Sequence, residues 1–154
     1  MVRVWFGNES DGLKRDRQDY VITLERQCHD IDAAKRFYCE GLGFQVMGVA
    51  NRADTRHVFL SHAHTPSFAI ALIWTKDAPP GKQGSDTQLL DLGSWSESEW
   101  AEQTARLAEL GFGATASKTA ISHQKWAEFL DPDGYPIRLT YTRPPVTQSR
   151  QDPD

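Results

Sequence analysis

The tripeptide Leu-Gly-Phe occurs twice in this chain, at Leu42-Gly43-Phe44 and at Leu110-Gly111-Phe112. Each copy ends a segment with helical periodicity and opens a segment typical of a β-strand. The copies stand 68 residues apart (110 − 42) in a chain of 154 residues. A repeat at this spacing predicts two equivalent helix-then-strand modules that fill most of the chain, and it constrains the architecture more than composition does.

The first half of the chain predicts one helix among four strands. Asp30 is a good N-cap, because its carboxylate can accept hydrogen bonds from the first backbone N–H groups of a helix. The helix that follows carries one apolar stripe, at Ile31, Ala34, Phe37 and Tyr38. Strands are expected at 20–28, 44–50, 56–61 and 67–74.

Alternation in the first of these strands assigns its side chains to two faces. Leu24 and Cys28 share one face with Ile22, and Thr23 and Glu25 share the other with Gln27. A face of Thr, Glu and Gln is expected to meet water or a ligand.

The second half repeats the order of the first. Ser96 and Glu99 form a capping box, and the helix behind them carries a stripe at Trp100, Thr104, Leu107 and Leu110. Strands are expected at 87–92, 112–117, 125–130 and 137–141. Asp131-Pro-Asp-Gly134 predicts a type I turn between the last two strands, with Pro and Gly at the positions this turn prefers.

The remaining segments mark the domain boundaries. Residues 1–18 read as an N-terminal arm, in which the alternation of Val2, Val4 and Phe6 predicts a short edge strand. Residues 77–84, with two prolines beside glycine, read as the linker between modules at about 19–76 and 85–142. Residues 143–154 read as a flexible tail.

Composition and charge exclude several classes of protein. The net charge of −4 and the pI near 5.7 argue against general nucleic-acid binding. The sequence contains no apolar run of transmembrane length and no signal-peptide core, so we expect no membrane partner and a cytoplasmic protein. Cys28 and Cys39 lie on different predicted elements, which favours free thiols over a disulfide.

The element order resembles the vicinal oxygen chelate superfamily, which includes glyoxalase I, extradiol dioxygenases and bleomycin-resistance proteins. The resemblance covers roughly residues 19–142 and rests on Asp30-Ile-Asp-Ala-Ala34, Phe37-Tyr38, Leu42-Gly43-Phe44 and Asp131-Pro-Asp-Gly134. It implies an α+β fold in which two βαβββ modules form a cupped mixed sheet with the helices on the outer face. It also implies a homodimer, with the modules placed side by side or exchanged between chains.

In metal-dependent members of this superfamily, four positions that point into the cup hold a divalent ion. The resemblance places these positions on Thr23, on Ala71, on Thr87 or Leu89, and on Arg138. Alanine offers no lone pair, and a guanidinium is a permanent cation without an acceptor, so it would repel the ion. We therefore expect no metal at this site and no other cofactor.

Other acidic and histidine residues leave alternatives open. His62-Ala-His64 places two imidazoles on one strand face or in a loop, where solvated histidines are commoner than metal ligands. His57 is expected at the surface. Glu25 and Glu128 remain candidates for a general acid–base pair.

The residues expected to line the cup are Thr23, Glu25, Ala71, Leu89, Asp91, Trp126, Glu128 and Arg138. Trp126 is either a stacking wall or part of the core, and Arg138 either anchors a ligand or forms an internal ion pair with an acidic neighbour. We expect a metal-free binding protein of the glyoxalase/bleomycin-resistance type that sequesters an antibiotic or another small aromatic ligand. The alternative is a lyase, isomerase or dioxygenase-like enzyme of the same superfamily, acting by acid–base chemistry or with a metal.

Overall fold

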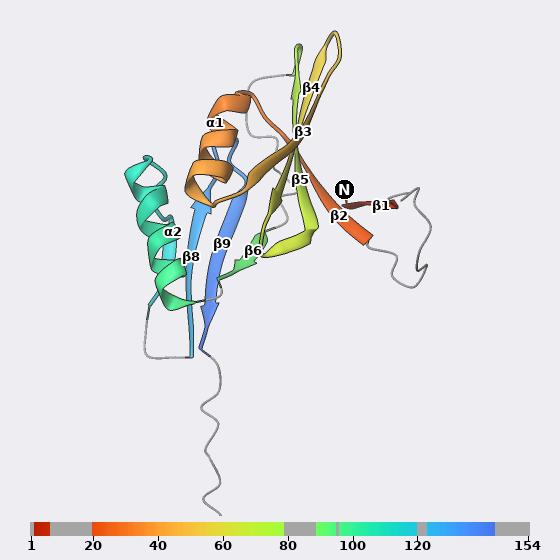
Figure 1. Ribbon diagram of the computed structural model, residues 1–154. Coiled ribbons are helices and arrows are strands. Elements are labelled where there is room, and N and C mark those ends of the chain that lie inside the picture. Colours follow the sequence, from red (N-terminus) through yellow and green to blue (C-terminus); the bar gives the residue numbers. More distant parts are fainter. Residues whose placement is uncertain (1, 7–19, 79–88, 95, 120–122, 144–154) are drawn as a thin grey trace, which may run out of the picture.

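A computed structural model describes residues 2–6, 20–78, 89–94, 96–119 and 123–143 of the chain. Figure 1 shows two mixed β-sheets with a helix packed on each. Most of the predicted arm, the predicted linker from 79 onward, Thr87, Trp95 and the tail from 144 lie outside the described residues.

The first module contains one helix and four strands, as its pattern predicts. Its elements are β2 (Tyr20–Gln27), α1 (Ile31–Lys35), a π-helical continuation η1 (Arg36–Gly41), β3 (Gln45–Asn51), β4 (Thr55–His62) and β5 (Thr65–Thr75). The strand order is β1-β2-β5-β4-β3, in which β2 and β5 are parallel and the other pairs antiparallel. The added strand β1 (Val2–Phe6) pairs with β2, which confirms the predicted edge strand.

The second module repeats this topology. Its elements are β6 (Leu90–Gly93), α2 (Glu97–Glu109), β7 (Ala116–Lys118), β8 (Gln124–Leu130) and β9 (Pro136–Thr142). The strand order is β6-β9-β8-β7, again with one parallel pair, β6 with β9. The predicted α+β fold of two βαβββ modules is therefore confirmed.

Both helices begin where the sequence predicts. The Asp30 carboxylate accepts from the N–H groups of Asp32 and Ala33, and the Ser96 hydroxyl accepts from the N–H of Glu99. The helix of the first module ends in a π-helical segment that the pattern did not indicate. A side chain at Gly41 would collide with Leu107 of α2, so the absence of a Cβ there allows the two helices to approach closely.

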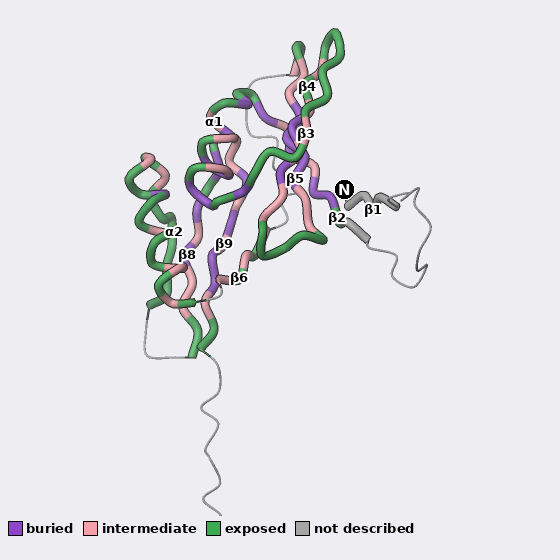
Figure 2. The backbone as a smooth tube through the Cα atoms, viewed as in Figure 1, coloured by how far each residue is buried: buried purple, intermediate pink, exposed green. Residues whose placement is uncertain are grey.

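The buried faces of both sheets meet in one core. Figure 2 shows buried segments running through both sheets and the first helix. The first module contributes the predicted stripe of Ile31, Ala34, Phe37 and Tyr38, while β8 and β9 contribute Phe129 and Leu139 among others. Because side chains alternate along a strand, each sheet turns its other set of side chains away from this core.

One strand differs from its prediction. The stretch 112–117 was expected to be a strand, but β7 spans only Ala116–Lys118. Gly111 has a positive φ of 90°, and the ring of Phe112 packs edge-on against Phe37 with centroids 5.0 Å apart. Phe112 therefore serves the helix interface rather than a sheet, and pairing begins only beyond Gly113.

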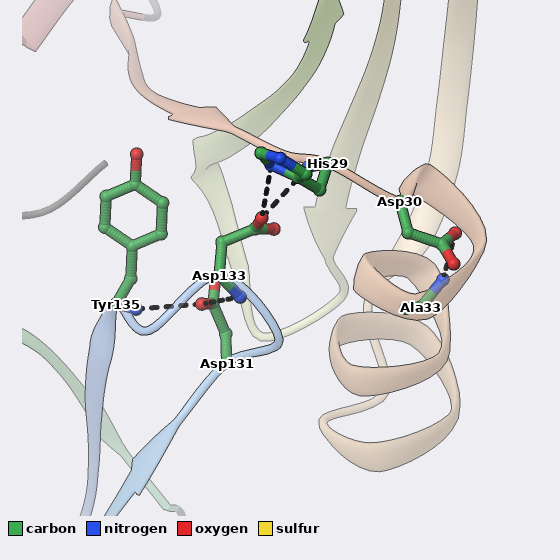
Figure 3. Close-up of polar contacts among 6 residues, drawn as sticks. All are labelled: His29, Asp30, Ala33, Asp131, Asp133 and Tyr135. Carbon is green, nitrogen blue, oxygen red and sulfur yellow. Dashed lines mark hydrogen bonds and ion pairs between the residues drawn. The ribbon is translucent and has the colours of Figure 1, made fainter. Parts of the chain in front are cut away.

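The Asp131–Gly134 turn joins the second module to the first. Gly134 donates to the carbonyl of Asp131 at 3.0 Å, as the predicted type I turn requires. Figure 3 shows Asp133 directed at His29, whose backbone N–H donates to the carboxylate at 2.9 Å. The buried hydroxyl of Tyr38 donates to Asp131 at 2.7 Å, and this buried pair links η1 to the turn.

Burial governs the ionisation of the groups around this junction. Burial raises the pKa of Asp131, although hydrogen bonds from Tyr38, Tyr135 and Asp133 oppose the shift. Burial also raises the pKa of the Cys28 thiol to about 12. Cys28 and Cys39 are both free, as predicted.

Among the described residues, no helix has the length and apolar character needed to cross a membrane.

Candidate functional site

The first sheet brings together three of the predicted site residues on the face opposite its helix. Glu25 pairs with Ala71 across β2 and β5, and Thr23 lies two residues before Glu25 on the same face. Thr23 and Ala71 are buried and Glu25 is half-buried. The side chain of Thr23 is therefore shielded from solvent. It is short, and its strand lies between β1 and β5.

Two aromatic residues that the sequence reasoning missed share this face. Phe59 pairs with Ala71 across β4 and β5, and His57 lies two residues before it. Their ring centroids are 6.3 Å apart. The period-two pattern of β4 could have revealed them, because buried Val58 and Leu60 alternate with them. Below, Thr23, Glu25, His57, Phe59 and Ala71 are called the module 1 face.

The second sheet brings together four more predicted residues on its own helix-distal face. Arg138 of β9 pairs with Asp91 of β6 on one side and with Glu128 of β8 on the other. Trp126 lies on the same face, two residues before Glu128. These four residues, Asp91, Trp126, Glu128 and Arg138, are called the module 2 face. Leu89 immediately precedes β6 and is exposed.

Arg138 is held by two neighbours. Its Nε donates to Glu128 Oε1 at 3.0 Å, and its Nη2 contacts the same oxygen. The guanidinium carbon lies 4.8 Å from the centroid of the Trp126 ring, in cation–π geometry. Glu128 is therefore the partner in the ion pair that the sequence left open, and Trp126 is half-buried rather than part of the buried core.

These contacts change what the carboxylates can do. Glu128 is paired with the permanent cation of Arg138, so its Oε1 already accepts from that guanidinium. Asp91 is exposed and accepts a 2.7 Å hydrogen bond from the hydroxyl of Thr140. Glu25 and Glu128 stand on different sheets, one on each face, and the acid–base pair that the sequence left open stays a prediction.

The residues at the superfamily's metal positions do not fit a metal ion. Ala71 has no donor atom, and Arg138 places a guanidinium, already paired with Glu128, where a ligand would stand. Of the described residues at these positions, Thr23 alone supplies an oxygen, whereas stable sites for divalent ions need several donors. In the described part of the chain, no group of three or more His, Cys, Asp or Glu side chains is placed to hold a metal.

The histidine pair has a structural role where the modules meet. His62 Nδ1 accepts from the backbone N–H of His64 at 3.2 Å, and its ring packs on Phe44 with centroids 5.2 Å apart. His64 Nδ1 lies 3.3 Å from Glu99 Oε1 of α2. Burial, and then the neighbouring His64, lowers the pKa of His62.

A small cavity adjoins these histidines. It has a volume of about 40 Å³ and is lined by Leu42, Phe44, His62, His64, Thr65, Leu92, Gly93, Glu99 and Gln103. This space suits a few water molecules rather than an organic ligand, and none of its lining residues belongs to the predicted site. The module 1 and module 2 faces are thus the candidate binding surfaces.

Two other tryptophans have structural contacts. Trp100 donates from its indole nitrogen to the carbonyl of Leu139 at 3.1 Å, which fixes α2 on the second sheet. Trp74 packs against the common core.

Comparison with known proteins places this arrangement among characterised folds. A sequence model of the Glyoxalase/Bleomycin resistance protein/Dioxygenase superfamily matches residues 20–139. No curated protein sequence matches the chain. A domain of the same description from Frankia sp. EAN1pec is 16% identical, with a TM-score of 0.66 over 79% of this chain and 95% of that one.

Two further solved structures share the fold. TnmS3, an antibiotic binding protein from Streptomyces sp. CB03234, is 25% identical, with a TM-score of 0.60 over 79% of this chain and 94% of that one. Glyoxalase I from Leishmania major is 21% identical, with a TM-score of 0.63 over 76% of this chain and 82% of that one.

Proposed function

This chain belongs to the Glyoxalase/Bleomycin resistance protein/Dioxygenase superfamily, and we propose that within it the chain is a metal-free binding protein for a small aromatic molecule. The observation that carries the proposal is the Arg138 group on the second sheet. Where metal-dependent members place a carboxylate ligand, this chain places a guanidinium stacked over Trp126 and paired with Glu128. Such a group cannot coordinate a metal, but it offers a flat polar surface to a ring.

The module 1 face supplies the second half of the proposed site. Ala71 is a small, buried residue in the middle of the sheet, and Phe59 beside it supplies an aromatic wall. Ligand sites combine apolar surface with placed polar groups, and the two faces together offer Phe59, Ala71 and Trp126 as apolar surface among polar and charged neighbours. The similarity to an antibiotic binding protein at 25% identity supports sequestration as the purpose of binding.

We propose further that a second copy of the chain takes part in the site. The side chains of Arg138 and Glu128 are 32% and 26% exposed in a single chain. Ligand sites commonly bury most of the ligand, which a sheet face left this open does not do. The edge strand β3 also exposes Val46, Met47 and Val49, an apolar surface suited to contact with another copy.

A thermal-shift screen of aromatic antibiotics and simpler fused-ring compounds tests the proposed function. A compound that binds only the native protein raises its melting temperature, and the increase should persist in the presence of a chelator. Trp126→Ala should reduce the increase while leaving the unliganded melting curve cooperative. Binding that requires an added divalent metal, or hits that Trp126→Ala leaves unchanged, would contradict the proposal.

A further inference from the structure

We propose that the preferred ligand carries an electron-rich aromatic ring bearing hydroxyl or amino groups, and that this ring lies on the outer side of the Arg138 guanidinium. The proposal rests on the proposed function and specifies its ligand class. It assigns the stacking surface to Arg138, with Trp126 as the layer beneath it.

The guanidinium of Arg138 is held in place before any ligand arrives. Glu128 binds it through Nε and Nη2, and the Trp126 ring lies on one side of it at 4.8 Å. The Arg138 side chain nevertheless remains 32% exposed. A planar group that is fixed at its edge and covered on one side presents its other side as the surface available to a ring.

The charge on that surface selects the electronic character of the ring. The face of an aromatic ring is negative at its centre, and a cation placed over it is attracted in proportion to the electron density of the ring. The Trp126 ring already makes this contact on one side of the Arg138 guanidinium. An electron-rich ligand ring would make it from outside, giving a stack of indole, guanidinium and ligand.

The residues beside Arg138 select the substituents. Asp91 and Glu128 stand at the paired positions on the two neighbouring strands, so carboxylates flank Arg138 on both sides. Ionised carboxylates only accept hydrogen bonds, and Asp91 is exposed with capacity beyond the bond from Thr140. Hydroxyl and amino groups donate hydrogen bonds and also enrich a ring in electrons, so both arguments point to the same ligands.

The same carboxylates disfavour anionic ligands. The module 2 face carries two carboxylates, Asp91 and Glu128, to one guanidinium. A carboxylated or sulfonated ring placed on Arg138 would therefore meet like charges on both sides. Arg138 therefore serves as a stacking surface rather than as an anchor for an anion, since Glu128 already neutralises it.

Three probes on one two-ring frame test the proposal by calorimetric titration of the full chain. They are 2-naphthol, which is electron-rich and donates a hydrogen bond; 2-methoxynaphthalene, which is electron-rich but has no donor; and 2-naphthonitrile, which is electron-poor with no donor. The guanidinium of Arg138 should attract an electron-rich ring more strongly than an electron-poor one. We therefore expect 2-methoxynaphthalene to bind about fivefold more tightly than the nitrile, and 2-naphthol to bind more tightly still.

Two variants separate the contributions. In Arg138→Gln the ratio between the methoxy compound and the nitrile should fall towards one, because the charge is lost. In Asp91→Asn the advantage of 2-naphthol over the methoxy compound should shrink, while the methoxy-to-nitrile ratio stays as in the unmodified protein. Circular-dichroism melting confirms that each variant is folded, and Arg138→Met, which likewise removes the charge, provides a second test if Arg138→Gln is unfolded.

Equal affinity for the three probes, or ratios that the Arg138 variants leave unchanged, would overturn this inference while leaving the proposed aromatic binding intact. No binding of any fused-ring probe or aromatic antibiotic would overturn both. Preference for the nitrile, or for naphthalene-2-carboxylate over 2-naphthol, would also contradict the assigned ligand class.

Discussion

The two helix-distal faces occupy equivalent positions in the repeat, yet they differ in chemistry. On the module 1 face, small Thr23 and Ala71 lie beside the aromatic residues His57 and Phe59. On the module 2 face, Trp126, Glu128 and Arg138 form one linked polar and aromatic group. One face is thus suited to supply space and apolar contact, and the other to supply orientation.

The two faces differ in two ways from what a metal site requires. At Ala71 the donor atom is missing. At Arg138 the charge has the wrong sign for a metal ligand, and Glu128 balances it. The first face offers a small residue and the second a stacked and paired guanidinium, so the two faces should respond differently to mutation.

The largest expected effect is on stability, when a side chain is removed from the core that supports both faces. The side chain of Tyr38 is fully buried in the core that both sheets share. Tyr38→Ala should destabilise the protein by about 3–5 kcal/mol, because it leaves a large cavity. Tyr38→Phe removes only the hydroxyl that donates to Asp131 and should cost about 1–3 kcal/mol. Urea unfolding measures both, and equal small losses would show that the modules do not depend on a common core.

The two faces can then be compared through one aromatic residue each. Trp126→Ala should weaken aromatic ligands about tenfold or more, because it removes stacking and the support of Arg138. Phe59→Ala should weaken them only about threefold, because it removes one wall of the space. Calorimetric titration gives both affinities. A larger loss at Phe59 than at Trp126 would reverse the roles assigned to the faces.

Acid should weaken the contact between the modules through His62. Its pKa is lowered in the folded protein, so the unfolded chain takes up a proton first as the pH falls. The stability contribution is therefore complete above the ordinary histidine pKa of about 6.5 and is lost as the pH falls towards the folded value.

Urea midpoints at about pH 7.5 and about pH 5.5 check this, because the interval spans the ordinary histidine pKa. The unmodified protein should lose more stability over the interval than His62→Gln, which cannot take up the proton. The raised pKa of Asp131 acts in the opposite direction, since stability from a carboxyl with a raised folded pKa is lost as the pH increases. A steeper loss in His62→Gln would contradict the assignment to His62.

The smallest expected effect is that of added metal ions on the melting temperature. Added zinc, nickel, iron or manganese should leave the melting temperature unchanged, since Ala71 and Arg138 cannot act as ligands. Elemental analysis of protein purified without added metal should likewise find none of these at stoichiometric amounts. A chelator-sensitive melting temperature would show that ligands other than the predicted set bind an ion.

Sequence patterns predict most of the fold and part of the site. The caps at Asp30 and Ser96 and the type I turn at Asp131 follow from local chemistry, so the sequence is sufficient to locate them. The misassigned strand at Phe112 shows the limit. An apolar residue after a glycine suits a strand and a helix contact equally well, and only the proximity of Phe37 decides between them.

The candidate site, like the fold, was predicted only in part from the sequence. Alternation puts Trp126 and Glu128 on one face of their strand, whereas Arg138 was added through the resemblance to the superfamily; the register shows that the three share a face. The choice of Glu128 as the partner of Arg138 depended on which strands are neighbours, which a single sequence leaves open. His57 was expected at the surface because its polar neighbour Arg56 masked the period of β4. The π-helical segment after Lys35 has no sequence signal that we can identify.

The central claim is that the ligand binds between the module 1 face of one copy and the module 2 face of another. Ala71→Phe, which fills the first face, and Trp126→Ala, which weakens the second, should each abolish tight binding in the pure homodimer. Carrying different affinity tags, the two variants can be mixed under mild denaturant, refolded together and purified as heterodimers. Melting curves should first show that each variant folds.

In such a heterodimer one site combines both altered faces, and the other combines two unaltered faces. Calorimetric titration of the heterodimer with an aromatic ligand identified by the thermal-shift screen is therefore the most direct test. The account predicts one ligand per dimer, bound with the affinity of the unmodified protein. A heterodimer without any site of unmodified affinity, or a protein that sediments as a monomer and still binds tightly, would contradict it.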